Sequence, residues 1–382
     1  MKRILLAVFL ISNVISSQEI INDTLPTTRQ DLDEVIVKGI RAKFSSPISY
    51  SNIYKEKLKN KNLGQDLPIL LNFLPSVVTT SDAGAGIGYT GIRVRGVSPQ
   101  STNITINGIP FNDPESMGTF WVNLPDFTSS VQSLQLQRGI GTSTNGSGAF
   151  GASINILTDN ISQTPYTEIS SSFGSFNTRK NTIKFSTGKI NDVFEFSGRF
   201  SKIDSDGYVD RAFSDLKSYF IQGTYLKGST LIKAISFAGH EKTYQSWYGL
   251  TMDQLKENRR QNPYTYENEI DNYKQDHYQL HWNEKINNFW SFNLGLNYTY
   301  GRGYFEQYRE DDNIDTYGGI VSSDTNLNGE KTDTTDLIRR RWLDNDFYVF
   351  NSSLNFVKNK IDLTISSSYS SYVGDHFGEV IW

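Results

Sequence analysis

The chain has 382 residues, of which 37 are basic and 41 acidic, so its formal net charge is −4, and it contains no cysteine and 4 histidines. This near balance of charge argues against a nucleic-acid-binding protein, and without cysteine there are no disulfides and no thiolate metal ligands. Aromatic residues reach 13% in a background rich in Ser, Asn and Gly, which favours a β-rich chain.

The N-terminal segment 1–17 has the features of a secretory signal peptide. Lys2 and Arg3 precede the apolar run Ile4–Ile11, and two small serines follow. Since this run is too short to cross a membrane as a helix, we expect the segment to direct export. The alternative is a buried N-terminal strand or helix.

Residues 18–37 combine a polar, Thr-rich tether with a short β-prone end. The end consists of Asp33, Glu34, Val35, Ile36 and Val37. A β-prone run at the edge of a flexible segment can pair its main chain with the exposed sheet edge of a partner protein. The alternative is the first strand of the following domain.

Residues 38–160 predict a small mixed α/β domain with elaborate loops. Residues 66–74 predict a short helix that ends at Pro75. Gly86–Gly91 matches the dinucleotide-binding string GxGxxG, but Ile92–Gly96 directly after it alternates like a strand, whereas a nucleotide site needs a helix there. We therefore expect an irregular glycine-rich loop. Further strands are expected at 103–109, with a hairpin turn at Asn107-Gly108, at 131–138 and at 153–158, and irregular loops at 111–126 and 142–151.

Five stretches in this order resemble the plug domain of TonB-dependent outer-membrane receptors. They are Asp33–Val37, Leu74–Val77, Ile92–Gly96, Ile104–Pro110, and Arg138-Gly139 followed by Gly146–Thr158. Two details depart from the family pattern: Gly151-Ala152-Ser153 stands where a Gly-Gly pair is usual, and Thr, Ser and Asn follow Gly139 where many members carry Leu-Tyr. The loop 111–125 is similar to receptors of the Bacteroidetes group. No Ig-like carboxypeptidase-regulatory domain is visible ahead of Asp33, which favours a siderophore, haem or vitamin as the ligand.

The resemblance implies roles for individual residues of this domain. Asp33–Val37 would be the TonB box, which TonB binds. Arg93 and Arg95 would form ion pairs with glutamates of the surrounding barrel wall, which hold the plug and shift during transport. Without the resemblance, the two arginines are expected to form a solvated face of a strand.

Residues 161–382 read as antiparallel strands. In the clearest of them, residues 289–301, Trp, Phe, Leu and Tyr alternate with Ser, Asn, Gly and Thr. A soluble sandwich would bury this apolar face, whereas a transmembrane β-barrel shows it to lipid, and the aromatic residues near both ends favour the barrel. Roughly nine strands are expected, near 166–175, 179–189, 192–203, 217–226, 229–240, 273–284, 289–301, 344–356 and 361–373, with long polar loops at 241–272 and 302–343.

This number of strands is too small to enclose a plug, because plugged barrels of this family have about 22 strands. We therefore expect an N-terminal fragment of a receptor. Its parts would be a signal peptide at 1–17, a tether with the TonB box at 18–37, a plug at 38–160 and an incomplete barrel at 161–382. The alternative is an independent small barrel beside a plug-like domain.

Ligand contacts are expected on loops that face outward from the plug and the strands. The candidates combine charge with aromatic surface, and they are Asp82, Tyr89, Asn112, Asp113, Glu115, Phe120 and Trp121 in the plug, and Trp247 and Tyr248 in the first long loop. The alternative is that these rings only pack loop against loop.

Other candidate chemistry is weaker. His277 and His281 share a face of one strand, where a polar lining is favoured over a metal or haem contact. Asp324–Gly329 resembles the start of a calcium loop, but Thr335 stands where an EF-hand needs glutamate. The sequence carries no nucleophile–base pattern, so we predict no enzyme, no cofactor and no resident metal.

Together these features predict a TonB-dependent receptor of the outer membrane, with plug and TonB box facing the periplasm. It would import a scarce metal chelate, haem or vitamin with energy that TonB transmits from the inner membrane. Its expected partners are TonB, outer-membrane lipid and this ligand, and no nucleic acid. The alternatives are a non-transporting barrel or surface-binding protein with a plug-like module, and a soluble all-β glycan-binding or glycan-cleaving protein.

Overall fold

A computed structural model describes residues 40–44, 46–141, 148–318, 329 and 333–382. The predicted signal peptide, the segment Asp33–Val37 and all of the calcium-like loop except Gly329 lie outside the described residues. Among the residues that are described, no helix is long and apolar enough to cross a membrane.

Two small sheets form the N-terminal α/β domain, which comprises the described residues up to 160. The larger sheet has the order β1-β6-β7-β4-β5, in which β4 and β7 are parallel and the other neighbours antiparallel. Its strands are β1 (Ser49–Tyr54), β4 (Thr102–Ile106), β5 (Ile109–Pro110), β6 (Val131–Arg138) and β7 (Ala152–Thr158). The second sheet pairs β2 (Val77–Ser81) with β3 (Thr90–Val94). The helical turns are α2 (Lys55–Lys59), α3 (Leu67–Leu70), η1 (Pro99–Ser101), η2 (Trp121–Asn123) and η3 (Phe127–Ser130).

Three local predictions for this domain are confirmed. The short helix is α3, although it ends at Leu70 rather than at Pro75, and Pro68 stands in its first turn, where a missing N–H costs little. Asn107 and Gly108 have φ values of 52° and 81°, the left-handed values that a two-residue hairpin turn needs between Ile106 and Ile109. The glycine-rich string leads into strand β3 rather than a helix, as expected for a loop that does not bind a nucleotide.

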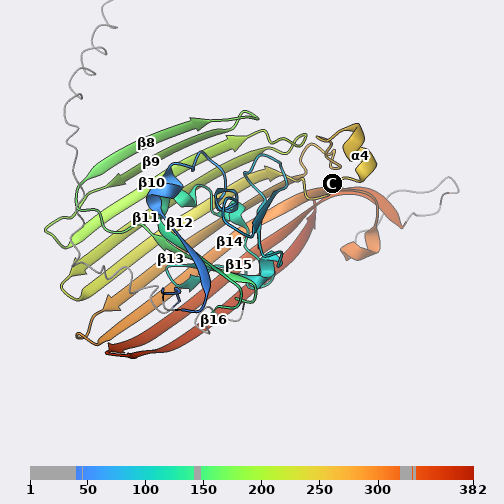
Figure 1. The fold of residues 1–382 in the computed structure, drawn as a ribbon. Coiled ribbons are helices and arrows are strands. Elements are labelled where there is room, and N and C mark those ends of the chain that lie inside the picture. The colour runs from blue at the N-terminus through green and yellow to red at the C-terminus, as the bar shows by residue number, and fades with distance from the viewer. Residues whose placement is uncertain (1–39, 45, 142–147, 319–328, 330–332) are drawn as a thin grey trace, which may run out of the picture. The chain divides into compact units, whose positions relative to one another are not determined.

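Nine long strands form one antiparallel sheet in which each strand pairs with its neighbours in the chain. Figure 1 shows β8 to β16 side by side in this order. The strands are β8 (Tyr166–Phe173), β9 (Arg179–Ser186), β10 (Phe194–Ser205), β11 (Ser214–Lys227), β12 (Thr230–Tyr244), β13 (Ile270–Glu284), β14 (Trp290–Asn313), β15 (Thr334–Lys358) and β16 (Ile361–Val380). All nine predicted strands are therefore confirmed. Two short helices occur between strands, α4 (Met252–Glu257) and η5 (Ile314–Tyr317).

Several strands extend beyond their predicted ends. β14 continues to Asn313 and β15 begins at Thr334, so much of 302–343, predicted as a loop, is strand. β12 and β13 likewise extend into 241–272. These ends mix charged and aromatic residues on both faces, so hydrophobic alternation no longer marks them, although the backbone pairing continues, as between Glu306 and Arg340.

The long sheet buries its polar face. On β14, Asn293, Asn297 and Thr299 are less than a tenth exposed, whereas Leu296 on the opposite face is 37% exposed. A soluble sheet with one covered face would bury its apolar side chains instead. The orientation predicted for residues 289–301 is therefore confirmed.

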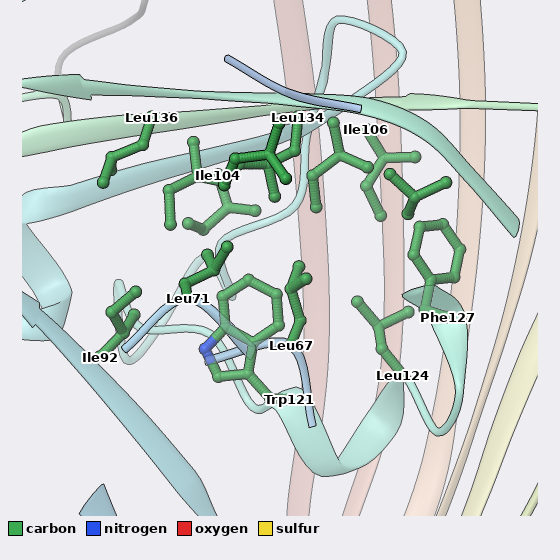
Figure 2. Packing of buried hydrophobic residues seen from close by; sticks show 14 of the residues in the cluster. Leu67, Leu71, Ile92, Ile104, Ile106, Trp121, Leu124, Phe127, Leu134 and Leu136 are labelled. Atoms are coloured by element: carbon green, nitrogen blue, oxygen red, sulfur yellow. The ribbon is translucent and has the colours of Figure 1, made fainter. Parts of the chain in front are cut away.

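One hydrophobic cluster joins the α/β domain to the long sheet. Figure 2 shows residues of this cluster, among them Trp121, Leu67 and Leu71. The ring of Phe127 lies 5.2 Å from that of Phe237 on β12, and Phe220 of β11 lies 6.1 Å away. Because each fully buried large apolar side chain contributes about 1.5–3 kcal/mol, this cluster stabilises the docking of the domain on the sheet.

Candidate functional site

Asp126 attaches the α/β domain to strands β9 and β10. It lies between η2 and η3 with φ of 52°, and its side chain is fully buried. Its carboxylate forms ion pairs with Lys180 at 2.6 Å and Arg199 at 3.5 Å. The hydroxyls of Thr182 and Ser201 donate hydrogen bonds to it at 2.7 and 2.6 Å. Four side chains of two strands therefore converge on one carboxylate of the α/β domain.

Asp159 forms a second attachment directly after β7. Its carboxylate pairs with Lys55 of α2 at 2.7 Å and with Lys184 of β9. Lys233 of β12 donates to the backbone carbonyl of Asp159 at 3.3 Å. Gln222 of β11 donates to the same carbonyl at 3.1 Å, so this residue connects the α/β domain to three strands of the long sheet.

Both aspartates are held in the charged form. Burial alone would raise the pKa of Asp126, but the positive charges of Arg199 and Lys180 outweigh burial and keep that pKa well below its ordinary value. Burial likewise acts to raise the pKa of Asp159, and Lys184 and Lys55 outweigh it, so the pKa is lowered. The two carboxylates therefore stabilise the folded state only while they are ionised.

Acid should loosen these attachments. Each carboxyl has a lower pKa in the folded state, so its contribution to stability is fully present above its ordinary value of 3.8 and is lost as the pH falls through the folded-state pKa. We expect the urea midpoint of the detergent-solubilised protein to fall as the pH is lowered below about 4, and to fall less steeply in the Asp126→Asn variant. Equal steepness in both proteins would contradict a role for Asp126.

In these attachments the α/β domain supplies the acidic group and the long sheet supplies basic groups. The family resemblance implies the reverse, with arginines on the plug and glutamates on the barrel wall. Arg93 and Arg95 are exposed, and neither forms an ion pair within the described residues. Their pairing with barrel glutamates stays a prediction.

Sequence reasoning did not identify Asp126 and Asp159, because neither stands in a recognisable motif. One signal was present on β9. Lys180 and Lys184 are an even number of residues apart, and Asn181 and Ile183 between them face outward. The two lysines therefore share the face that the strand buries. Charges on a buried strand face require partners of opposite sign, which only the folded chain reveals.

A cavity of about 250 Å³ lies between the α/β domain and strands β12 to β16. The α/β domain lines it with the loop Pro110–Ser116, Phe120 and Asn123, among others. Of its lining residues, 4 carry carboxyl groups, several are aromatic, and none is Lys or Arg. Concave sites of this kind, with apolar rings and a few polar groups, suit small-molecule ligands.

Five of the predicted ligand contacts line this cavity. They are Tyr89, Asn112, Asp113, Glu115 and Phe120. Their role as ligand contacts stays a prediction, but the fold brings together residues that are well separated in the sequence.

The other four predicted contacts lie elsewhere. Trp121 is only 3% exposed and belongs to the hydrophobic cluster, which corrects the expectation that it faces a ligand. Asp82 is exposed and outside the lining. Tyr248 stacks on another loop tyrosine at 5.0 Å, and Trp247 packs edge-on against Tyr89 at 5.3 Å. These two rings therefore pack against other loops, as in the alternative to ligand binding given in the sequence analysis.

Tyr89 connects the glycine-rich loop to two acidic residues of the long sheet. Its hydroxyl donates to the carboxylate of Asp271 and lies 3.5 Å from that of Glu241. Both acidic residues are buried, with 8% and 1% of their surfaces exposed. Burial and these two charges raise the pKa of Tyr89 well above its ordinary value, so the phenol remains a donor. Neither acidic residue was identified from the sequence, since each is a single carboxyl within a strand.

The loop that carries Asp113 and Glu115 reaches the last strand. Asp113 Oδ1 accepts hydrogen bonds from the backbone N–H groups of Ser116 at 2.7 Å and Glu115 at 3.1 Å. Glu115 Oε2 accepts from the Tyr372 hydroxyl at 3.0 Å and lies 2.9 Å from His376 Nε2, both on β16. The loop is therefore connected to β16 at the wall of the cavity.

His277 also lines the cavity. Its ring lies 5.3 Å from that of Phe111 and stacks on Phe237 at 4.4 Å, and its Nδ1 is 2.9 Å from the Thr299 hydroxyl. Within the described part of the chain, no group of three or more His, Cys, Asp or Glu is placed to hold a metal ion. These contacts are those of a polar lining.

Residues 42–153 match the family model of the TonB-dependent Receptor Plug Domain. The probable TonB-dependent siderophore receptor PirA of Acinetobacter baumannii is 24% identical over 204 residues, which are 51% of this chain and 25% of that protein. The ferric enterobactin receptor PirA of Pseudomonas aeruginosa is 26% identical over 192 residues, 46% of this chain and 26% of that protein. The chain thus matches about a quarter of the length of these curated relatives. The similarity to Bacteroidetes receptors stays a prediction.

Solved receptor structures share the fold. The siderophore receptor PirA of Acinetobacter baumannii superposes with a TM-score of 0.59 at 16% identity, over 88% of this chain and 48% of that receptor. The ferric preacinetobactin receptor BauA of the same species superposes with a TM-score of 0.63 at 10% identity, over 88% of this chain and 49% of that receptor. The chain is therefore similar to the TonB-dependent receptors in its plug domain, and it shares with solved receptors the fold of the antiparallel sheet on which that domain docks.

Proposed function

We propose that the protein imports a scarce ligand across the outer membrane by TonB-dependent active transport, with an iron–siderophore complex, haem or a vitamin as the favoured ligand. The observation that carries the proposal is the plug domain, docked through buried ion pairs on the polar face of a long antiparallel sheet. The relatives are named a siderophore receptor and a ferric enterobactin receptor, which supports an iron chelate. The proposed role is that of a transporter and not of an enzyme.

The outer face of the sheet suits a lipid environment. Leu280, Trp282 and Phe350 are 43%, 41% and 39% exposed on it. Removing apolar surface from water contributes roughly 25 cal/mol per Å², so lipid would cover this face favourably. In the proposed arrangement the strands lie in the outer membrane after export through residues 1–17, and the tether 18–37 reaches into the periplasm.

The proposed mechanism begins with ligand binding in the cavity beside Pro110–Ser116. TonB then adds Asp33–Val37 as a strand to its own sheet, since an extended segment can pair with an exposed edge. Force on this segment displaces part of the α/β domain from the long sheet and opens a path. Arg93 and Arg95 would exchange ion pairs with barrel glutamates during this step.

Deleting Asp33–Val37 tests the proposal. Energised uptake should fall to the level of cells that lack the protein, while surface binding stays unchanged, because the deletion removes the proposed TonB contact and leaves the cavity intact. The measurement is accumulation of labelled ferric chelates, haem and cobalamin, each with and without an inhibitor of the proton gradient.

Deleting the five tether residues Thr24–Thr28 is the matched control and should leave uptake intact. Uptake that persists after loss of Asp33–Val37 would contradict transport through TonB and favour a surface-binding protein.

A further inference from the structure

The cavity beside Pro110–Ser116 carries information about the charge of its ligand. Carboxyl groups line it from both sides: Asp113 and Glu115 from the α/β domain, and Glu241 and Asp271 from the long sheet. No Lys or Arg is among its lining residues. An anionic group entering this space would meet carboxyl groups on both walls and no basic side chain, which disfavours its binding.

Among the buried carboxylates outside the cavity, Asp66 and Glu195 have neutral hydrogen-bond partners, whereas the two that attach the α/β domain to the long sheet have cationic ones. Asp126 and Asp159 are buried too, and each has two basic side chains as ion-pair partners. Glu241 and Asp271 are buried to a similar degree, yet their side-chain contacts are with neutral hydroxyls, those of Tyr89 and Thr243. A buried carboxylate without a cation is costly while it is ionised. A cation bound in the cavity would offset that cost.

An independent observation points to a donor-bearing ligand. Asn123 is only 6% exposed, lines the cavity, and its Oδ1 has no hydrogen-bond partner among the described residues. On the opposite wall, the Oδ1 of Asn345 is likewise without a partner there. Buried acceptors are almost always satisfied. Neither oxygen is accessible from the cavity as the side chains stand, so a ligand with N–H groups would satisfy them after a turn of the two side chains.

Aromatic rings complete the lining. Phe111 and Phe120 come from the α/β domain, and Tyr273, Phe347 and Tyr372 from strands β13, β15 and β16. Aromatic faces attract ammonium and guanidinium groups and also cover apolar surface, with about 0.5–2 kcal/mol for each cation–π contact. Acceptors and rings together favour one class of ligand.

We propose that the cavity binds a positively charged group, an ammonium or guanidinium next to an aromatic or apolar body, and rejects anionic ligands of the same size. The inference rests on the proposed import function and narrows it: among metal chelates and vitamins, the ligand presents a cationic end to this cavity. Glu115, which His376 already contacts, contributes less than Asp113, Glu241 and Asp271.

Three probes of equal ring size and different charge test this. Tyramine carries an ammonium, N-acetyltyramine is neutral, and 4-hydroxyphenylacetate is an anion. With the purified protein in detergent, we expect tyramine to bind at least about tenfold more tightly than N-acetyltyramine in calorimetric or NMR titrations, and the anion to show no binding. Equal affinities, a preference for the anion, or no binding of tyramine would each overturn the proposal.

Matched variants locate the effect. Asp113→Asn combined with Glu241→Gln should reduce tyramine affinity to that of the neutral probe, whereas Asp204→Asn, at a partly exposed site paired with Lys202 on β10, should leave it unchanged. Thermal unfolding of each variant checks that it is folded, and removing an uncompensated buried charge should not destabilise the fold. A folded double variant that keeps the preference for tyramine would also overturn the proposal.

Uptake and binding measurements on the same protein distinguish failure of the charge preference from failure of the import proposal. TonB-box-dependent uptake of an anionic ligand would leave import standing and contradict the charge preference. If the protein binds tyramine selectively but uptake is unchanged after deletion of Asp33–Val37, the charge preference stands and import through TonB is contradicted.

Discussion

Replacing Asp126 by alanine is expected to lower the free energy of unfolding by about 3–5 kcal/mol, because it leaves Lys180 and Arg199 buried without a counter-charge. The loss concerns the docking of the α/β domain, since both cations belong to the long sheet. Urea titration of the detergent-solubilised protein, followed by tryptophan fluorescence and by limited proteolysis of the α/β domain, measures it. Proteolysis should begin at lower urea than in the unchanged protein.

Asp204 on β10 provides the matched control. It also forms an ion pair with a lysine, Lys202 at 2.7 Å, but its side chain is 44% exposed. Exposed pairs contribute about 0–1 kcal/mol, so Asp204→Ala should change little. A loss at Asp126 no larger than at Asp204 would show that the buried attachment does not hold the domain. A Lys180→Met change in the Asp126→Ala background should recover part of the loss, because it removes one of the two stranded charges.

Replacing Gly239 on β12 by alanine is expected to weaken docking through contact with the α/β domain rather than through charge. A Cβ atom there would lie 2.7 Å from the carbonyl carbon of Asn123 and 2.8 Å from Cδ of Pro125, closer than Cβ atoms approach in real structures. Backbone cannot move aside as a side chain can, so η2 must shift. Overpacking of this kind costs about 1–3 kcal/mol, measured by the same urea titration.

Gly223 on the neighbouring strand β11 is the control, because a Cβ there would meet nothing within 4 Å. Gly223→Ala should be neutral or slightly stabilising, since glycine in a strand costs roughly 0.5–1 kcal/mol relative to alanine. If both substitutions have the same effect, the close approach of η2 to β12 is not what positions the domain.

The strands could be predicted because their alternation is a local property. Trp290 to Tyr300 shows apolar and polar residues in turn, and the structure confirms both the strand and its orientation. The outer ends could not be predicted, since around Glu306 charged and aromatic residues are mixed on both faces and only the hydrogen bonds to β15 define the strand. Pairing between segments decides where such a strand stops.

The part of the candidate site that is local in the sequence could be predicted, and the part that depends on the fold could not. Asp113, Glu115 and Phe120 lie on one irregular loop, and an acidic and aromatic loop is visible in the sequence. Trp121 follows directly, but its ring turns into the core, and composition cannot tell which way a ring points. Asp271 joins the site only through the fold, as its partner Tyr89 is 182 positions away.

The position of β1 decides which contacts bear a pull first. Among the described residues, β1 is the first strand, and it lies at the edge of the larger sheet with β6 as its one neighbour. Ahead of it, Arg41 donates to the carbonyl of Asn155 at 2.8 Å, and the side chain of Gln135 bonds both the N–H and the carbonyl of Ala42. Tension applied from the N-terminal side therefore reaches a few hydrogen bonds and the half-exposed ion pair of Lys43 with Asp362 before either of the buried attachments at Asp159 and Asp126.

Beyond β1, the chain meets Lys55 and its bond to Asp159, and only much later Asp126. The mechanical order along the backbone thus runs from the weakest attachments to the strongest. A limited pull would strip the edge strand and α2 while the rest of the α/β domain stays fixed to the long sheet, so the domain could return to its starting arrangement once the load is released.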